Sequence, residues 1–285
     1  MIAWAHDLSG VARPCAPSLE RNLNRGPLLS MYVSLGYAVV ATDYTGLGTD
    51  FRNAFRDLES NARDVIYSIP AARRAVPGLS SEWIAVGYGE GGLTVVRIGE
   101  LGPILDSHHL GGIVIAGLTG LEPQDRSAKG NPLHSPLSLA YGVKTVFPEF
   151  EVGEILTEAA LRLYPKLEQG CAEPTAEEKS ASEMLKPNWQ NNRLVEQYLK
   201  RNTVGDTPAR GPFLVIASEA SAQGPESSTR QVIRRMCQQG DRVQLETYAN
   251  PDPSNVIGDS VRDQMAWIQG RLGGRGAPGN CPGHD

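Results

Sequence analysis

Short apolar runs alternate with amphipathic stretches along most of this chain of 285 residues. Strands are predicted where an apolar run ends at glycine or turn residues, and helices where apolar residues recur every three or four positions. This alternation predicts an α/β fold with a mostly parallel, doubly wound sheet that helices cover on both faces. The predicted strands are residues 1–5, 37–42, 83–88, 112–117, 212–217 and 242–248, and the predicted helices are 28–36, 58–75, 90–99, 227–239 and 261–272.

The periodicity changes between residues 121 and 207, where no convincing strand is found. Helices are predicted there at residues 137–146, 154–167 and 194–200. An insertion of this size between two strands predicts a helical cap, or lid, and caps of this kind shape a ligand cavity. We therefore expect an α/β core in two parts (1–120 and 208–273), a cap (121–207) and a C-terminal tail (274–285).

The segment 83–96 has the pattern of a buried strand, a sharp glycine-rich turn and a helix. In α/β hydrolases the same turn carries G-x-S-x-G, with the serine nucleophile held on strained backbone. Here the turn reads Gly87-Tyr88-Gly89-Glu90-Gly91, so Gly89 stands at the position of the nucleophile. Glycine enters the strained conformation without a Cβ clash, which favours a stable turn that has lost its reactive side chain.

Composition and charge narrow the classes of partner. A hydrophobic content of 40% in a chain of this length supports a substantial core. The net charge of -5, without a block of like charges, offers no attractive field for nucleic acid. No apolar run is long enough to span a bilayer, so no transmembrane segment is predicted. Because the chain opens inside a predicted strand, we expect further N-terminal strands, and any signal peptide, to precede Met1.

The four cysteines are Cys15, Cys171, Cys237 and Cys281. They show no C-x-x-C spacing, so a zinc site is not expected, and nothing in the sequence indicates another metal or a cofactor. Scattered cysteines can be small buried hydrophobes. Cys15 lies in a proline-rich loop, however, and Cys281 in a tail rich in glycine and proline. These settings favour disulfides and therefore an oxidising compartment.

Several motifs in chain order resemble the secretory lipase family, the cap-bearing α/β hydrolases related to yeast lipase A. The similarity covers nearly the whole chain and implies an acyl-binding cavity under a cap and a secreted or cell-envelope location. It also implies two disulfides, most naturally Cys15 with Cys171 and Cys237 with Cys281. The motifs are Ala3-Trp4-Ala5-His6, residues 11–18 (VARPCAPS), 41–48 (ATDYTGLG), 135–137 (SPL), 164–171 (YPKLEQGC) and 240–243 (GDRV).

Lipases of this family use a Ser, Asp, His triad in that chain order. The resemblance places the three positions on Gly89, Ser221 and Pro253. Glycine has no nucleophile, serine carries no charge at neutral pH, and proline has no base, so acyl transfer through a triad is lost. The sequence therefore predicts a lipase-like pseudoenzyme whose capped cavity takes an acyl-lipid or ester ligand, or a partner protein.

Other residues near the elbow could form a rearranged site. Glu90 follows Gly89, and it either points into the cavity with a raised pKa or is a carboxylate favoured by the helix dipole. Tyr88 is either a hydrogen-bond donor in the pocket or part of the packing. Asp7 stands where bacterial family members have glycine, which indicates an altered oxyanion loop. The alternative function is an active carboxylic-ester hydrolase, similar to a triacylglycerol lipase, that uses Glu90 or His134.

The five histidines are candidates for a replacement base. His6 ends the first strand near the oxyanion loop, where a structural role is expected. His108 and His109 precede a predicted strand at the far end of the sheet and are expected to be solvated. His134 lies in the predicted cap, and His284 lies in the tail.

Overall fold

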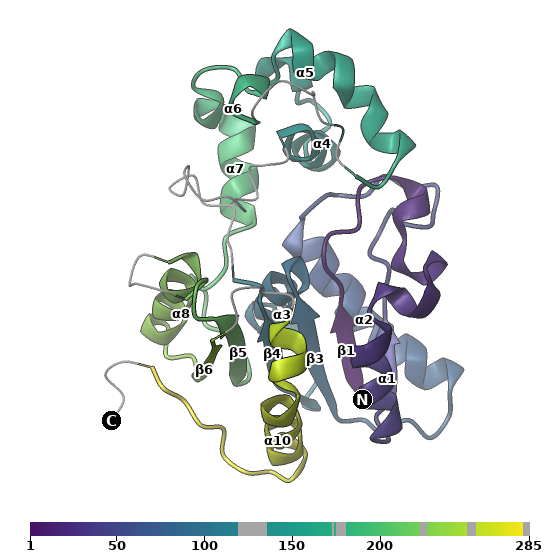
Figure 1. Ribbon diagram of the computed structural model, residues 1–285, viewed down its shortest axis with the longest axis vertical. Helices are drawn as coiled ribbons and strands as arrows, with labels where there is room; N and C mark the ends of the chain where they lie inside the picture. The colour runs from purple at the N-terminus through teal and green to yellow at the C-terminus, as the bar shows by residue number, and fades with distance from the viewer. Residues whose placement is uncertain (119–135, 173, 175–180, 223–226, 250–254, 282–285) are drawn as a thin grey trace.

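The computed structural model describes residues 1–118, 136–172, 174, 181–222, 227–249 and 255–281. Within these ranges, six strands form one sheet in the order β2-β1-β3-β4-β5-β6 (Figure 1). Every neighbouring pair of strands is parallel, so the predicted α/β fold with a parallel sheet is confirmed. The strands are β1 Ile2–Ala5, β2 Val39–Ala41, β3 Trp83–Tyr88, β4 His109–Ile115, β5 Phe213–Ser218 and β6 Val243–Tyr248.

Helices cover both faces of this sheet, as Figure 1 shows. The α-helices are α1 Gly26–Ser34, α2 Leu58–Ala75, α3 Glu90–Glu100, α4 Pro136–Val146, α5 Glu158–Leu163, α6 Ala181–Met184, α7 Arg193–Arg201, α8 Ser228–Gln238, α9 Val256–Asp259 and α10 Val261–Leu272. Short 3-10 helices are η1 Arg13–Cys15, η2 Pro17–Leu19, η3 Arg21–Asn24, η4 Gly102–Ile104, η6 Val152–Glu154, η7 Tyr164–Gln169 and η8 Trp189–Asn191.

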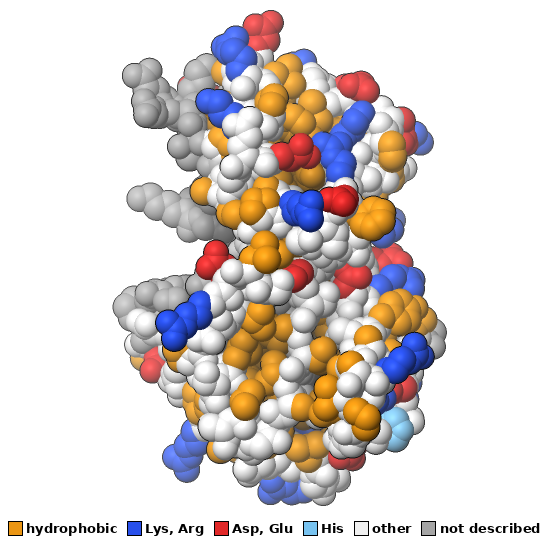
Figure 2. Space-filling model, turned by 90° about the vertical axis from the view of Figure 1, so that its right-hand side faces the viewer, with side chains coloured by type: hydrophobic (Ala, Val, Ile, Leu, Met, Phe, Trp, Pro, Cys, Tyr) orange, Lys and Arg blue, Asp and Glu red, His pale blue; other side chains and the backbone are white. Residues whose placement is uncertain are grey.

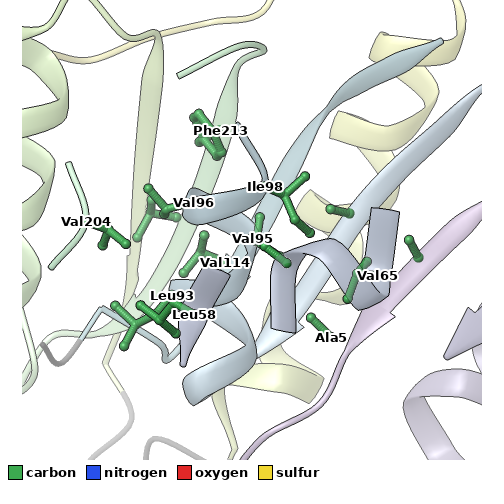
Figure 3. Close-up of a cluster of buried hydrophobic side chains, with 14 of the residues drawn as sticks. Ala5, Leu58, Val65, Leu93, Val95, Val96, Ile98, Val114, Val204 and Phe213 are labelled. Carbon is green, nitrogen blue, oxygen red and sulfur yellow. The ribbon is translucent and has the colours of Figure 1, made fainter. Parts of the chain in front are cut away.

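Alternating strand residues divide between two apolar layers, because successive side chains of a strand point to opposite faces. One layer joins Ala85 and Val114 to α2, α3 and α8. Figure 3 shows Val114 of this layer together with Val65 of α2 and Val95 of α3. The other joins Ile84 and Ile113 to α1 and α10. Each fully buried valine or isoleucine contributes about 1.5 to 3 kcal/mol, so these two layers hold the sheet rigid beneath the elbow.

The segment between β4 and β5 carries α4 to α7 and lies above the sheet in Figure 1. These helices have an apolar cluster of their own, which includes Phe150, Ile155 and Tyr198. The Tyr198 hydroxyl donates to the backbone oxygen of Phe55, which ties α7 to the loop before α2. The division of the chain into core, cap and tail stays a prediction.

Both predicted disulfides are confirmed. The Cα atoms of Cys15 and Cys171 lie 5.4 Å apart, and this bond joins the loop after β1 to the segment after η7. The Cα atoms of Cys237 and Cys281 lie 5.7 Å apart. The second bond is accompanied by Asn280, whose side chain accepts from the Leu245 N–H and donates to the Leu245 oxygen. The tail therefore covers the free edge of β6, which would otherwise expose unpaired backbone groups.

Some predicted elements differ from those observed. The strand predicted at 112–117 is β4, which begins at His109 and ends before Ala116, whose φ of 49° leaves the extended region. His109 is consequently buried against Trp83, with ring centroids 4.5 Å apart, and the expectation that it is solvated is wrong, whereas His108 is exposed.

Two further predictions differ from the structure, one for a helix and one for a strand. The helix predicted at 154–167 is split into α5 and the 3-10 helix η7, because Pro165 lacks the N–H that an α-helix would use. The strand predicted as buried at 37–42 is only half-buried as β2, because it forms an edge of the sheet. The short helix α9 had no clear periodicity in the sequence.

Candidate functional site

The predicted strand–elbow–helix is observed at residues 83–100. Gly89 joins β3 to α3 with φ 57° and ψ -124°, a conformation that residues with a side chain rarely adopt. The backbone around it is crowded, since a Cβ atom on Gly91 would lie 2.0 Å from the backbone oxygen of Ala5. The chain therefore keeps the strained frame that presents a nucleophile in hydrolases, and it presents no side chain there.

The side chain of Asp7 occupies the space above Gly89. A Cβ atom on Gly89 would lie 2.1 Å from Asp7 Oδ1 and 2.3 Å from Asp7 Cγ, closer than van der Waals contact allows. The Glu90 N–H donates to Asp7 Oδ1 at 2.9 Å. In hydrolases, the N–H of the residue after the nucleophile belongs to the oxyanion hole. Asp7 thus brings a carboxylate to the position where such an enzyme would hold both its nucleophile and its oxyanion.

The side chain of Glu90 forms a polar cluster with Arg56 and Asn61. Its Oε2 lies 3.4 Å from Arg56 Nε, and Asn61 Nδ2 donates to its Oε1 at 2.9 Å. The Glu90 and Arg56 side chains are only 4% and 5% exposed. Burial raises the pKa of Glu90 to about 7, and Arg56 limits this rise. Glu90 lines a small internal cavity and is not among the residues that line the pocket of about 350 Å³ described below.

Replacing Glu90 by glutamine is expected to remove a pH dependence of stability. Because the folded-state pKa is about 7 and the ordinary value is 4.5, the native chain retains a proton that the unfolded chain releases. The stability that this proton contributes is fully present below the pKa of Glu90 in the unfolded chain. It is lost as the pH rises through the pKa of Glu90 in the folded chain. Urea unfolding at about pH 5 and about pH 7.5 should therefore show a smaller difference for Glu90→Gln than for the natural chain.

The control for this experiment is Glu59→Gln. Arg63 donates to Glu59 and lowers the pKa of that carboxyl, so its titration falls below this pH interval. We expect the control to retain the pH difference of the natural chain. An equal pH difference in the Glu90 variant and the natural chain would show that Glu90 does not hold the extra proton.

His6 lies at the end of β1 and is 5% exposed. Its Nδ1–H donates to the backbone oxygen of Asp7 at 2.6 Å, and its ring stacks on Tyr44 with centroids 4.0 Å apart. Burial lowers the pKa of the imidazole, which favours the neutral ring. Its Nε2 is left as a hydrogen-bond acceptor with no partner in the described part of the chain. His6 therefore has a clear structural role at the wall of the pocket that it lines.

A pocket of about 350 Å³ lies beside the elbow. Its walls include the loop of residues 6–10, the side chains of Arg25 and Phe55, and the disulfide between Cys15 and Cys171. The Arg25 guanidinium lies 4.5 Å from the centroid of the Tyr88 ring, and its Nη2 lies 4.0 Å from Asp7 Oδ2. Tyr88 itself is buried in the apolar layer beneath and does not line the pocket.

Of the other two positions that the family resemblance aligns with a triad, only Ser221 lies in the described residues. Ser221 lies in the turn after β5, where its Oγ donates to the Ser218 backbone oxygen at 3.0 Å. Its side chain thus closes a local turn. Pro253, His134 and His284 lie outside the described residues. Among the residues that are described, no group of three histidine, cysteine or carboxylate side chains could hold a metal ion.

Sequence analysis missed Arg25 and Arg56 as members of the site. Neither arginine lies in a motif, and both reach the elbow from the loops that follow β1 and β2. Arg56 has a φ of 56°, and such backbone strain costs about 1 to 3 kcal/mol. The backbone strain and the buried ion pair are visible only in three dimensions.

Helix length and surface charge bear on the kinds of partner that this chain can bind. None of the helices in the described ranges is both long and apolar enough to cross a membrane. Figure 2 shows one side of the molecule, where acidic, basic and hydrophobic side chains are interspersed rather than gathered into a broad field of one charge. On this side, a partner with a highly charged backbone would find no extended surface of opposite charge.

No protein-family model matches the chain, and no curated protein does. Solved structures do resemble it. The rice cell wall degrading esterase LipA from Xanthomonas oryzae has a TM-score of 0.68 at 18% identity, over 94% of this chain and 80% of that one. Candida antarctica lipase A has a TM-score of 0.74 at 15% identity, over 98% of this chain and 72% of the lipase.

A putative hydrolase from Legionella pneumophila has a TM-score of 0.70 at 17% identity, over 95% of this chain and 79% of that one. All three likenesses cover 94% or more of this chain. At such low identities they show a shared architecture. This chain therefore has the α/β-hydrolase fold of lipases and esterases.

Proposed function

We propose that this chain is a lipase-like α/β hydrolase without triad chemistry, and that it binds a ligand in the pocket beside its elbow. The observation that carries the proposal is the backbone of Gly89, which has the conformation of a nucleophile elbow and carries no nucleophile. Removal of the nucleophile alone eliminates nearly all triad catalysis, and only the contributions of binding and of the oxyanion hole remain.

The position of Asp7 supports the same conclusion. A developing oxyanion would need the Glu90 N–H, which already donates to Asp7 Oδ1. It would also meet a carboxylate at the place where hydrolases offer hydrogen-bond donors. Stabilisation of an acyl-transfer transition state is therefore lost along with the nucleophile.

The proposed ligand is an acyl lipid or another ester. Two structural neighbours are named an esterase and a lipase, and the pocket beside the elbow is where such a fold would hold an acyl group. A volume of about 350 Å³ suits a small ligand or one segment of a larger one. A partner protein at the pocket mouth is the other occupant that we consider.

We further propose that α4 to α7 act as a lid over this pocket, and that the chain works outside the reducing cytosol. The bond between Cys15 and Cys171 fastens the helical segment to the wall of the pocket. Disulfides persist in oxidising compartments, so a secreted or cell-envelope location fits both bonds.

The direct test is labelling of the natural chain with a fluorophosphonate probe, together with turnover of p-nitrophenyl butyrate. We expect no labelled serine and no turnover above that of the heat-unfolded chain. Labelling, or turnover that a single pocket substitution abolishes, would support the alternative of an active ester hydrolase with a rearranged site. Glu90 is a poor candidate for that site because it is paired with Arg56 and Asn61.

Restoring a serine at the elbow is expected to destabilise the chain without restoring activity. A Cβ on residue 89 meets Asp7 Oδ1 at 2.1 Å, and a non-glycine residue at this φ adds backbone strain of about 1 to 3 kcal/mol. Gly89→Ser should therefore lower Tm by roughly 2 to 8 °C in a thermal scan. Asp7→Gly in the same chain should recover part of this loss, and an unchanged Tm in Gly89→Ser would contradict the close contact.

A further inference from the structure

The space above Gly89 has the features of an anion site. The N–H of Glu90 points into it from the first turn of α3, a helix of 11 residues whose N-terminus carries partial positive charge. Arg25 Nη2 approaches the same place from α1's N-terminal side, 4.0 Å from Asp7 Oδ2. A backbone donor, a helix dipole and a guanidinium together favour a carboxylate or another small oxyanion.

This anion site already has an occupant from the chain itself. Asp7 Oδ1 accepts from the Glu90 N–H at 2.9 Å, and its carboxylate fills the volume that a side chain on residue 89 would need. The site opens into the pocket of about 350 Å³, which Asp7 also lines. His6 lines the same pocket, and its buried Nε2 is an acceptor without a partner among the described residues, so it favours a ligand that donates a hydrogen bond over an anion.

We propose that Asp7 is the specificity-determining residue of this pocket. Its carboxylate supplies the anion that the elbow binds, so the natural pocket excludes free carboxylates, and removal of Asp7 opens a site for them. This inference rests on the proposed binding function and names the ligand class more closely. The ligand enters as a neutral ester or a neutral alcohol, because a free acid would place a second negative charge beside Asp7.

Glu20 provides the contrast within the same pocket. It also lines the cavity with a carboxylate, but it is exposed and makes no contact with the elbow. Loss of Glu20 changes the net charge of the pocket by the same amount as loss of Asp7 and leaves the anion site filled. Comparing a Glu20 variant with an Asp7 variant therefore distinguishes binding at a local site from a general effect of the pocket's charge.

The test compares acetate binding to the natural chain, Asp7→Ala, Asp7→Ser and Glu20→Ala, each with both disulfides intact. Binding of ¹³C-labelled acetate is followed by NMR titration at constant ionic strength, and Tm is measured with acetate and with chloride. We expect both Asp7 variants to bind acetate at least roughly tenfold more tightly than the natural chain and Glu20→Ala. Acetate, but not chloride, should raise the Tm of the Asp7 variants alone.

Equal acetate affinity in all four chains would overturn the inference, and so would an equal gain in Glu20→Ala. Asp7→Ser retains a polar side chain and keeps the test available if Asp7→Ala does not fold. Failure of the proposed function would appear separately, as labelling or ester turnover by the natural chain. That outcome does not depend on acetate binding by the variants.

Discussion

Replacing Arg56 by alanine is expected to lower the free energy of unfolding by about 3 to 5 kcal/mol. The Arg56 and Glu90 side chains are 5% and 4% exposed, and Arg56 Nε lies 3.4 Å from Glu90 Oε2. Removing the guanidinium leaves a buried carboxylate that can only be neutralised by taking up a proton at an energetic cost. Urea unfolding at about pH 8.5 measures the loss, because Glu90 is ionised and paired with Arg56 above its folded-state pKa of about 7.

The matched control is Arg63→Ala, which removes an arginine from an exposed ion pair in α2. Arg63 Nη2 lies 2.9 Å from Glu59 Oε1, with the arginine side chain 41% exposed. Such pairs contribute about 0.3 to 0.5 kcal/mol, so the control should change stability little. The double variant Arg56→Ala/Glu90→Gln should recover much of the loss, because no buried charge remains. If Arg56→Ala lowers the free energy of unfolding as little as the control does, the ion pair between Arg56 and Glu90 does not stabilise the elbow.

The second large effect is expected from the bond between Cys15 and Cys171. Replacing both cysteines by alanine should lower the free energy of unfolding by about 2 to 5 kcal/mol. The two residues are 156 positions apart in the chain, so the bond closes a long loop and strongly restricts the unfolded state. The loss of the bond also frees one wall of the pocket from the helical segment.

The bond between Cys237 and Cys281 serves as the comparison. Its sequence separation is 44, so in the chain-entropy model its removal should cost about 1 kcal/mol less. Denaturant unfolding of both double-alanine variants, at equal protein concentration and without reductant, tests the difference. An equal loss in the two variants would mean that native packing, rather than loop closure, determines the contribution of each bond.

The two features on which the proposed loss of triad chemistry rests lie at one place. Gly89 lacks a nucleophile, and Asp7 fills the volume that glycine leaves. The two features depend on each other. A serine at residue 89 would clash with Asp7. Without Asp7, the Glu90 N–H would lose its carboxylate partner. If the proposed function is right, placing a serine nucleophile at the elbow would therefore need at least two coupled changes, at residues 89 and 7.

The sequence by itself determined the parallel sheet, the elbow at Gly89 and the helices α4 and α7 of the segment between β4 and β5. These follow from local apolar periodicity and from glycine's freedom at positive φ, which are properties of neighbouring residues. It also determined the disulfide pairing, although only through the resemblance of ordered motifs to a family. His109 shows the limit of local patterns, since its burial depends on packing against Trp83.

Only the tertiary structure decided what surrounds the elbow. Asp7 and Glu90 are 83 positions apart, and nothing in either segment signals that one carboxylate accepts from the backbone of the other. The pairing of Arg56 with Glu90 likewise joins residues from separate loops, so its burial and its effect on the pKa of Glu90 depend on the fold. Local sequence fixes backbone preference, whereas the contacts between distant side chains, and hence the chemistry of the site, arise when the strands are brought together.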